Sequence, residues 1–127
     1  MNVFKRAWAS IESTVSPRHF YRLSGLWLPW FAWPAAILLS VGLIWGLAIA
    51  PEDYQQGNSY RIIFIHVPAA SLAMGGYLLL AICAVISLVW RVKTADAVAR
   101  AAAPVGALFC LLALITGSLW GKPTWGT

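Results

Sequence analysis

The distribution of charged residues divides the chain into three long uncharged stretches separated by short polar segments. The stretches are Leu23–Pro51, Ile62–Trp90 and Ala101–Gly121. Each reaches the ~20 residues that a helix needs to cross the hydrocarbon core of a bilayer. None shows the alternation of apolar and polar residues that is typical of barrel strands. The pattern therefore predicts three membrane-spanning helices, at about residues 26–50, 65–90 and 102–121.

Composition supports the same fold class. Hydrophobic residues make up 61% of the 127 residues and charged residues only 10%, and the mean hydropathy is +0.75. Soluble domains carry roughly 25% charged residues, so we expect an all-α integral membrane protein. The length leaves room for one transmembrane domain over residues 1–127 and for no separate soluble domain.

The basic residues flank the uncharged stretches and alternate in number. There are four before the first stretch, one in the first connection, three in the second connection and one after the last stretch: Lys5, Arg6, Arg18 and Arg22; Arg61; Arg91, Lys93 and Arg100; Lys122. Cytoplasmic segments carry the excess of Lys and Arg. This alternation predicts a cytoplasmic N-terminus and 91–100 loop, with the 51–61 loop and the C-terminal residues outside. The net charge of +5 is thus a topology signal, and no nucleic acid partner is expected.

The N-terminal region allows two further interpretations. Val3–Glu12 mixes basic and apolar residues at helical spacing, which is typical of a helix on the cytoplasmic membrane face and equally of a frayed terminus. Ala48-Ile49-Ala50 has the small-x-small form of a signal-peptide cleavage site. The uncharged run Leu26–Ala50 is nevertheless longer than the apolar core of a signal peptide, about 7–15 residues, which favours a membrane span.

Glycine and proline positions fit helices that pack in lipid. Gly42 and Gly46 form one G-x-x-x-G and Gly117 and Gly121 another, a weak signal for close helix contact. Proline is tolerated in the first turn of a helix because its missing N–H has no intrahelical partner there. The prolines expected near the beginning of a span are Pro29, Pro34, Pro68 and Pro104.

His66 is the only histidine inside an uncharged span, and no Asp, Glu, Lys or Arg lies in one. Polar groups at membrane depth are costly and are usually functional. Pro68 indicates that the second helix begins close by, which puts His66 in its first turn at the outer surface. A simpler interpretation is an interfacial histidine that hydrogen-bonds a carbonyl group.

The predicted topology brings the C-terminal end of the chain to the same face as His66. Trp120-Gly121-Lys122-Pro123-Thr124-Trp125-Gly126 is rich in turn formers, so we expect the third helix to end there in a bent backbone. An aromatic belt at the membrane interface explains Trp120. It does not explain the repeated Trp-Gly, which would expose flat aromatic faces.

These segments resemble a known family. The C-terminal segment 120–127 looks like the beginning of the tryptophan-rich WWD motif of haem-handling membrane proteins. Tyr60–Ala70 is similar to the segment that presents a haem-ligating histidine in the CcmC (HelC, haem exporter protein C) family of haem-delivery proteins in type I cytochrome c maturation. The resemblance covers nearly the whole chain but only the N-terminal half of the family's roughly six spans. We therefore expect half of a six-helix bundle, truncated within the motif.

The resemblance implies a carrier of haem b in a bacterial inner membrane. His66 would be an axial ligand of the iron, and a second external histidine would lie in the other half. Trp120 and Trp125 would hold the porphyrin, together with Gly121, Pro123 and Gly126. Arg61 or Lys122 could pair with its propionates, although Arg61 could equally be an exposed loop charge. The implied partners are a periplasmic haem chaperone and an ABC-type transporter complex.

Other functions remain open at this point. One is a b-haem-anchoring membrane subunit of a respiratory complex, which would bury paired histidines within its spans, whereas His19 is predicted on the other side from His66. Another is a purely structural subunit. Cys83 and Cys110 are isolated in apolar runs and indicate packing residues. We find no nucleotide-binding loop and no catalytic constellation, so we expect no enzyme.

Overall fold

The computed structural model describes residues 16–126, which form three long helices. These are α2 (Pro17–Ile44), α3 (Ile63–Trp90) and α4 (Lys93–Trp125), with a π-helical turn η1 (Trp45–Ile49) after α2 and a 3-10 turn η2 (Asn58–Ile62) before α3. Segments 18–49, 58–90 and 93–123 are each long and apolar enough to cross a membrane. The all-α membrane fold with three spans is therefore confirmed. The expected surface helix Val3–Glu12 lies outside the described residues.

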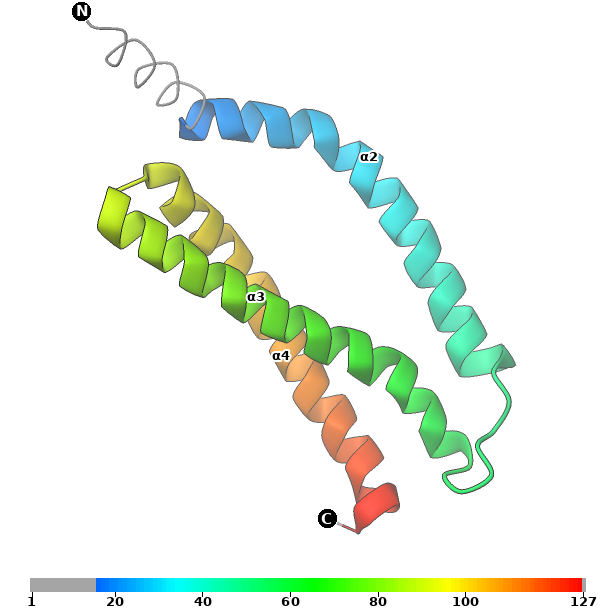
Figure 1. The fold of residues 1–127 in the computed structure, drawn as a ribbon. Helices are drawn as coiled ribbons and strands as arrows, with labels where there is room; N and C mark the ends of the chain where they lie inside the picture. The colour runs from blue at the N-terminus through cyan, green and yellow to red at the C-terminus, as the bar shows by residue number, and fades with distance from the viewer. Residues whose placement is uncertain (1–15, 127) are drawn as a thin grey trace, which may run out of the picture.

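Helix α2 begins earlier than the uncharged stretch and bends along its length. The Ser16 hydroxyl accepts a hydrogen bond from the His19 N–H at 3.4 Å, and Pro17 is the first helical residue. Pro29 and Pro34 are therefore inside the helix, so their expected place in the first turns is wrong. Proline removes an intrahelical hydrogen bond and crowds the preceding turn, which accounts for the curvature visible in Figure 1.

Helices α3 and α4 form an antiparallel hairpin with an almost direct connection. Arg91 adopts a left-handed conformation with φ 53°, and α4 begins two residues later. The expected 91–100 loop is wrong, because most of it is the first part of α4. An ion pair between Asp96 and Arg100 joins successive turns there. Hydropathy detects only the apolar part of a helix, and α4 extends beyond it, which leaves Pro104 in the helix interior.

The hairpin is the packed part of the molecule. Helix α3 packs mainly against α4, whereas α2 touches the hairpin sparsely and diverges from it along most of its length (Figure 1). Small residues allow the close approach, since a Cβ added to Gly76 would lie 3.4 Å from the Cα of Gly106. Buried Cys83 and Ala69 also come from α3. Much of α2 remains exposed.

One end of the bundle collects segments that are distant in sequence. The first turn of α3, the last turns of α4, η1 and the α2–α3 loop meet there, close to the C-terminus in Figure 1. We call this region, residues 45–66 and 113–126, the His66 end. His19 lies at the beginning of α2, near the other end of the bundle.

Candidate functional site

His66 occupies the first turn of α3, as predicted, and is half-buried against α4. Its Nδ1 lies 3.1 Å from the carbonyl oxygen of Ala113 and 3.1 Å from the hydroxyl oxygen of Thr116. The simpler interpretation of the sequence, in which His66 hydrogen-bonds a carbonyl group, therefore accounts for one of the contacts of Nδ1. The imidazole is fixed to the neighbouring helix through this nitrogen.

The surface of α4 under His66 is shaped to receive the ring. Thr116 is only 8% exposed, and its hydroxyl donates a hydrogen bond to the carbonyl of Leu112 at 2.7 Å. Gly117 leaves the space that the ring fills, because a Cβ there would lie 2.9 Å from Cε1 of His66. Sequence reasoning missed this surface. Its signal was present, since Ala113, Thr116, Gly117 and Trp120 have the spacing of one helical face.

The two C-terminal tryptophans continue the same surface. The ring centroids of His66 and Trp120 are 5.9 Å apart, and those of Trp120 and Trp125 are 5.1 Å apart in an edge-to-face arrangement. Trp125 is exposed and Trp120 half-buried. The structure thus brings the predicted histidine and both predicted tryptophans together.

The expected bent backbone after Trp120 is wrong, because α4 continues to Trp125. Pro123 lies in the last turn of the helix, where it removes only a single terminal hydrogen bond. Gly126 ends the helix in a left-handed conformation with φ 76°, and its N–H donates to the carbonyl of Lys122 at 3.0 Å. The turn formers therefore end the helix five residues later than expected. Gly121 remains helical, and a Cβ added there would lie in ordinary contact with the Trp125 ring, 3.6 Å from Cε3.

The α2–α3 loop is attached to α4 through Trp120. The indole Nε1–H donates to the side-chain oxygen of Gln56 at 2.8 Å. Asp53 holds the loop in shape, because its carboxylate accepts hydrogen bonds from the backbone N–H groups of Gln55 and Gln56 at 2.9 and 2.8 Å. Gln56 had no distinguishing signal in the sequence.

Arg61 closes the end of the first span. Its guanidinium group donates to the carbonyl of Leu47 at 3.1 Å and to the carbonyl of Ala50 at 2.9 Å. Carbonyl groups at a helix C-terminus lack intrahelical donors, and a cation there also interacts favourably with the helix dipole. Arg61 therefore joins the η2 turn before α3 to the η1 turn after α2, a role that the sequence did not predict.

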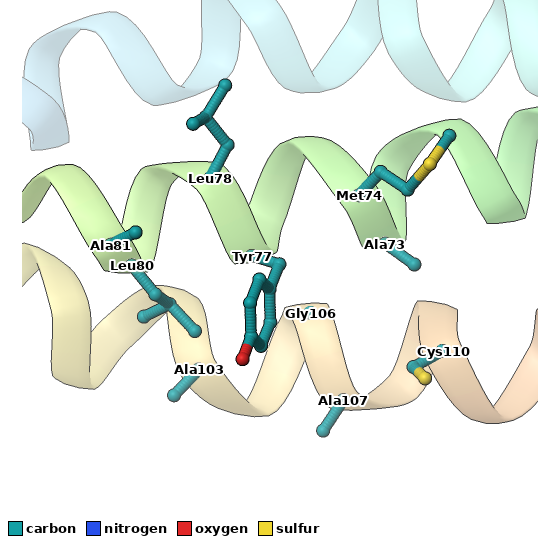
Figure 2. Close-up of a pocket in the computed structure, with 10 residues that line it drawn as sticks. All are labelled: Ala73, Met74, Tyr77, Leu78, Leu80, Ala81, Ala103, Gly106, Ala107 and Cys110. Atoms are coloured by element: carbon teal, nitrogen blue, oxygen red, sulfur yellow. The ribbon is translucent and has the colours of Figure 1, made fainter.

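An apolar groove lies elsewhere on the α3–α4 seam, at membrane depth (Figure 2). It has a volume of about 640 Å³. Its lining is almost entirely apolar and comes from both helices, with Met74 and Tyr77 from α3 and Gly106 and Cys110 from α4. The side chains in it that could ligate iron are the Cys110 thiol, the Met74 thioether and the Tyr77 phenol, and its lining contains no histidine. The groove is distinct from the His66 end.

The donor set at the His66 end limits the kind of metal it could hold. Among residues 16–126, no group of three His, Cys, Asp or Glu side chains is placed to hold a metal ion. A bare zinc ion needs three or four protein ligands. Haem iron already has four ring nitrogens and needs only axial ligands, such as one imidazole. The combination of one histidine with two tryptophans therefore suits haem better than a bare ion.

Comparisons with known proteins agree with this chemistry. The family model described as "CcmC: Heme exporter protein C" matches residues 10–127. Heme exporter protein C of Escherichia coli K12 is 50% identical over 120 residues, which cover 94% of this chain and 49% of the relative. The protein of the same name from Bradyrhizobium diazoefficiens is 51% identical over 112 residues, 88% of this chain and 42% of the relative. The protein of the same name from Rhodobacter capsulatus is 38% identical over 118 residues, which cover 93% of this chain and 49% of the relative.

No solved structure matches the chain. The chain spans about half the length of the curated relatives it matches. The family match covers the His66 segment, the second connection and the C-terminal tryptophans in a single stretch. The chain therefore belongs to the CcmC family of haem exporter protein C.

Proposed function

We propose that this protein binds haem at the His66 end and hands it on for the maturation of c-type cytochromes. The observation that carries the proposal is the meeting of His66 with Trp120 and Trp125 at one end of the bundle, in a member of a family named for haem export. Haem b is the cargo, carried and then released. An end-of-bundle location favours release, because a site sealed between helices would retain its ligand.

In this proposal each residue has a separate task. His66 supplies one axial nitrogen to the haem iron. Trp120 and Trp125 offer flat apolar faces to the porphyrin. Gly121, Pro123 and Gly126 form and end the last turn of α4, and so determine how the two indoles are presented.

The cation for the haem propionates is Lys122 rather than Arg61. Arg61 already donates to two backbone carbonyls. Lys122 is exposed on the last turn of α4, between the two tryptophans, and forms no ion pair within residues 16–126. A free ammonium group next to the aromatic surface is available for a charge-assisted hydrogen bond to a carboxylate.

We assign the His66 end to the periplasmic side of a bacterial inner membrane. The assignment rests on the alternation of basic residues, with Arg91, Lys93 and Arg100 at the opposite end of the α3–α4 hairpin and only Arg61 between α2 and α3. The N-terminus is then cytoplasmic. The receiving partner is a periplasmic haem chaperone, and the protein works within an ABC-type transporter complex of the cytochrome c maturation system.

The alternative of a b-haem-anchoring respiratory subunit is disfavoured by geometry. Electron-transfer subunits of that kind hold haem between paired histidines inside the spans. In this structure His19 lies in the first turn of α2 and His66 in the first turn of α3, at different ends of the bundle, so the two do not form such a pair. A purely structural subunit would not require an imidazole fixed beside two indoles.

Haem titration of the detergent-purified protein tests the proposal. We expect His66→Ala, and the double variant Trp120→Ala with Trp125→Ala, to lose most of the bound haem as measured by its absorbance. The matched controls are His19→Ala and the exposed pair Trp27→Ala with Trp30→Ala on α2, which should retain it. Equal haem content in the His66 and His19 variants would contradict the proposal.

A further inference from the structure

The contacts of His66 determine which ring nitrogen carries the proton. Nδ1 lies 3.1 Å from two oxygens, the carbonyl of Ala113 and the hydroxyl of Thr116. A carbonyl oxygen can only accept a hydrogen bond. The single hydroxyl proton of Thr116 is donated to the Leu112 carbonyl at 2.7 Å, so its oxygen also acts as an acceptor towards His66. Nδ1 therefore has two acceptors and must be the donor.

A neutral imidazole with its proton on Nδ1 has its lone pair on Nε2. This is the arrangement that a metal-ligating histidine requires, with one nitrogen facing the metal and the other N–H donated to a protein oxygen. Thr116 is 8% exposed, so water has little access to compete for this hydrogen bond. The ring is also confined sterically by Gly117, where even a methyl group would collide with Cε1.

We propose that Thr116 is a positioning residue for haem capture: together with the Ala113 carbonyl, it holds His66 in the Nδ1–H tautomer and reserves Nε2 for iron. The proposal rests on the proposed function, in which His66 is the axial ligand. Thr116 itself touches neither haem nor iron. Its effect on haem is transmitted through the orientation and basicity of the imidazole.

The tautomer is measurable without haem. Nitrogen NMR of the detergent-solubilised chain, labelled with ¹⁵N-histidine and recorded in alkaline buffer where imidazole is uncharged, distinguishes the two tautomers. His66→Ala assigns the signals, because His19 is the other histidine. We expect His66 to have a protonated Nδ1 and an unprotonated Nε2. A protonated Nε2 would overturn the proposal.

Substitutions at Thr116 test the effect on haem. Thr116→Val keeps the shape of the side chain and removes its hydroxyl group. We expect the haem dissociation constant to rise by about tenfold, which is the lower end of the effect of removing a hydrogen-bond partner from a metal-ligating histidine. The effect is at the lower end because the Ala113 carbonyl remains as an acceptor. The Nδ1 proton should also exchange with solvent faster. Thr116→Ser keeps the acceptor and should bind haem as the unmodified chain does. Ser118→Ala is the matched control, because its hydroxyl bonds only its own helix, at the Ile115 carbonyl.

The outcomes separate the two proposals. If His66→Ala loses haem but Thr116→Val binds it as tightly as the unmodified chain, the positioning role is wrong and the proposed function stands. If His66→Ala retains haem, the proposed function is wrong, while the NMR result still decides the tautomer. A loss in Thr116→Val that Thr116→Ser does not rescue would assign the effect to packing and overturn the role of the hydroxyl.

Discussion

The seam between α3 and α4 differs sharply between the His66 end and the groove at membrane depth. At the His66 end, the helices are joined by hydrogen bonds from a histidine and by an aromatic contact with Trp120. In the groove, the same two helices meet around Gly106 through mostly apolar side chains, including that of Tyr77, and leave an apolar space. The same two helices thus form a hydrogen-bonded, closely packed contact at one end and an apolar groove elsewhere.

The difference shows why the volume of a cavity is a poor guide to function in a membrane protein. The apolar groove offers few directional contacts beyond the Tyr77 hydroxyl, and the close packing of two helices through small residues explains it. A histidine within a membrane span is costly, and one that is held by two oxygens is usually kept for a function. The site is marked by polar groups, and variants at matched positions in the two regions test this conclusion.

The largest difference is expected between two glycine substitutions on α4. In Gly117→Ala the new methyl group would collide with the His66 ring. We expect haem affinity to fall by about 100-fold, the upper end of the loss seen when the surroundings of a metal-ligating histidine are altered. Gly106→Ala meets nothing within 4 Å and should bind haem normally. Haem titration checks both. Equal losses would mean that the groove and the His66 end act as one site.

A second pair of glycines tests how α2 is attached at the His66 end. A Cβ on Gly46 would lie 2.8 Å from Cγ of Phe64, whereas a Cβ on Gly42 meets nothing within 4 Å. Gly46→Ala should lower the free energy of unfolding by about 2 kcal/mol through overcrowding, whereas Gly42→Ala should not lower it, since alanine favours a helix over glycine. Denaturation in detergent measures the difference. An unaffected Gly46→Ala would show that α2 moves freely against α3.

The loop contact with Trp120 should have a smaller effect. Gln56→Leu removes the acceptor of the indole N–H, which costs about 1 kcal/mol and should weaken haem binding about fivefold through a less fixed Trp120. Gln55→Leu is the control, because the Gln55 side chain is exposed. Identical haem affinities for the two variants would indicate that the loop does not position the tryptophan.

The smallest expected effect concerns charge. Lys122→Gln should weaken haem binding about twofold, in keeping with an exposed ion pair, and the loss should shrink at high salt. Arg61→Gln should instead lower thermal stability, because Arg61 joins the end of α2 to α3. If Arg61→Gln weakened haem binding more than Lys122→Gln while both variants were equally stable, Arg61 and not Lys122 would be the partner of the propionates.

Much of this protein was accessible from its sequence. The three spans follow from the requirement that each membrane helix be apolar over its own length, which is a local condition. The first-turn position of His66 follows from the short distance to Pro68 and from the end of the polar loop. The helix ends were less predictable. Hydropathy overlooks the polar first turns of α2 and α4, and turn-forming residues did not stop α4 at Trp120.

The tertiary structure alone decided how the site is held together. The hydrogen bonds of His66 join residues 47 and 50 positions apart, and that between Trp120 and Gln56 spans 64 positions. No local pattern specifies which oxygen of α4 meets which nitrogen of α3, because that depends on the rotation and register of two packed helices. The sequence determined that a histidine and two tryptophans would lie at one end of a membrane bundle. The packing of α3 on α4 decided the roles of Thr116 and Gly117, and the approach of η2 to η1 decided that of Arg61.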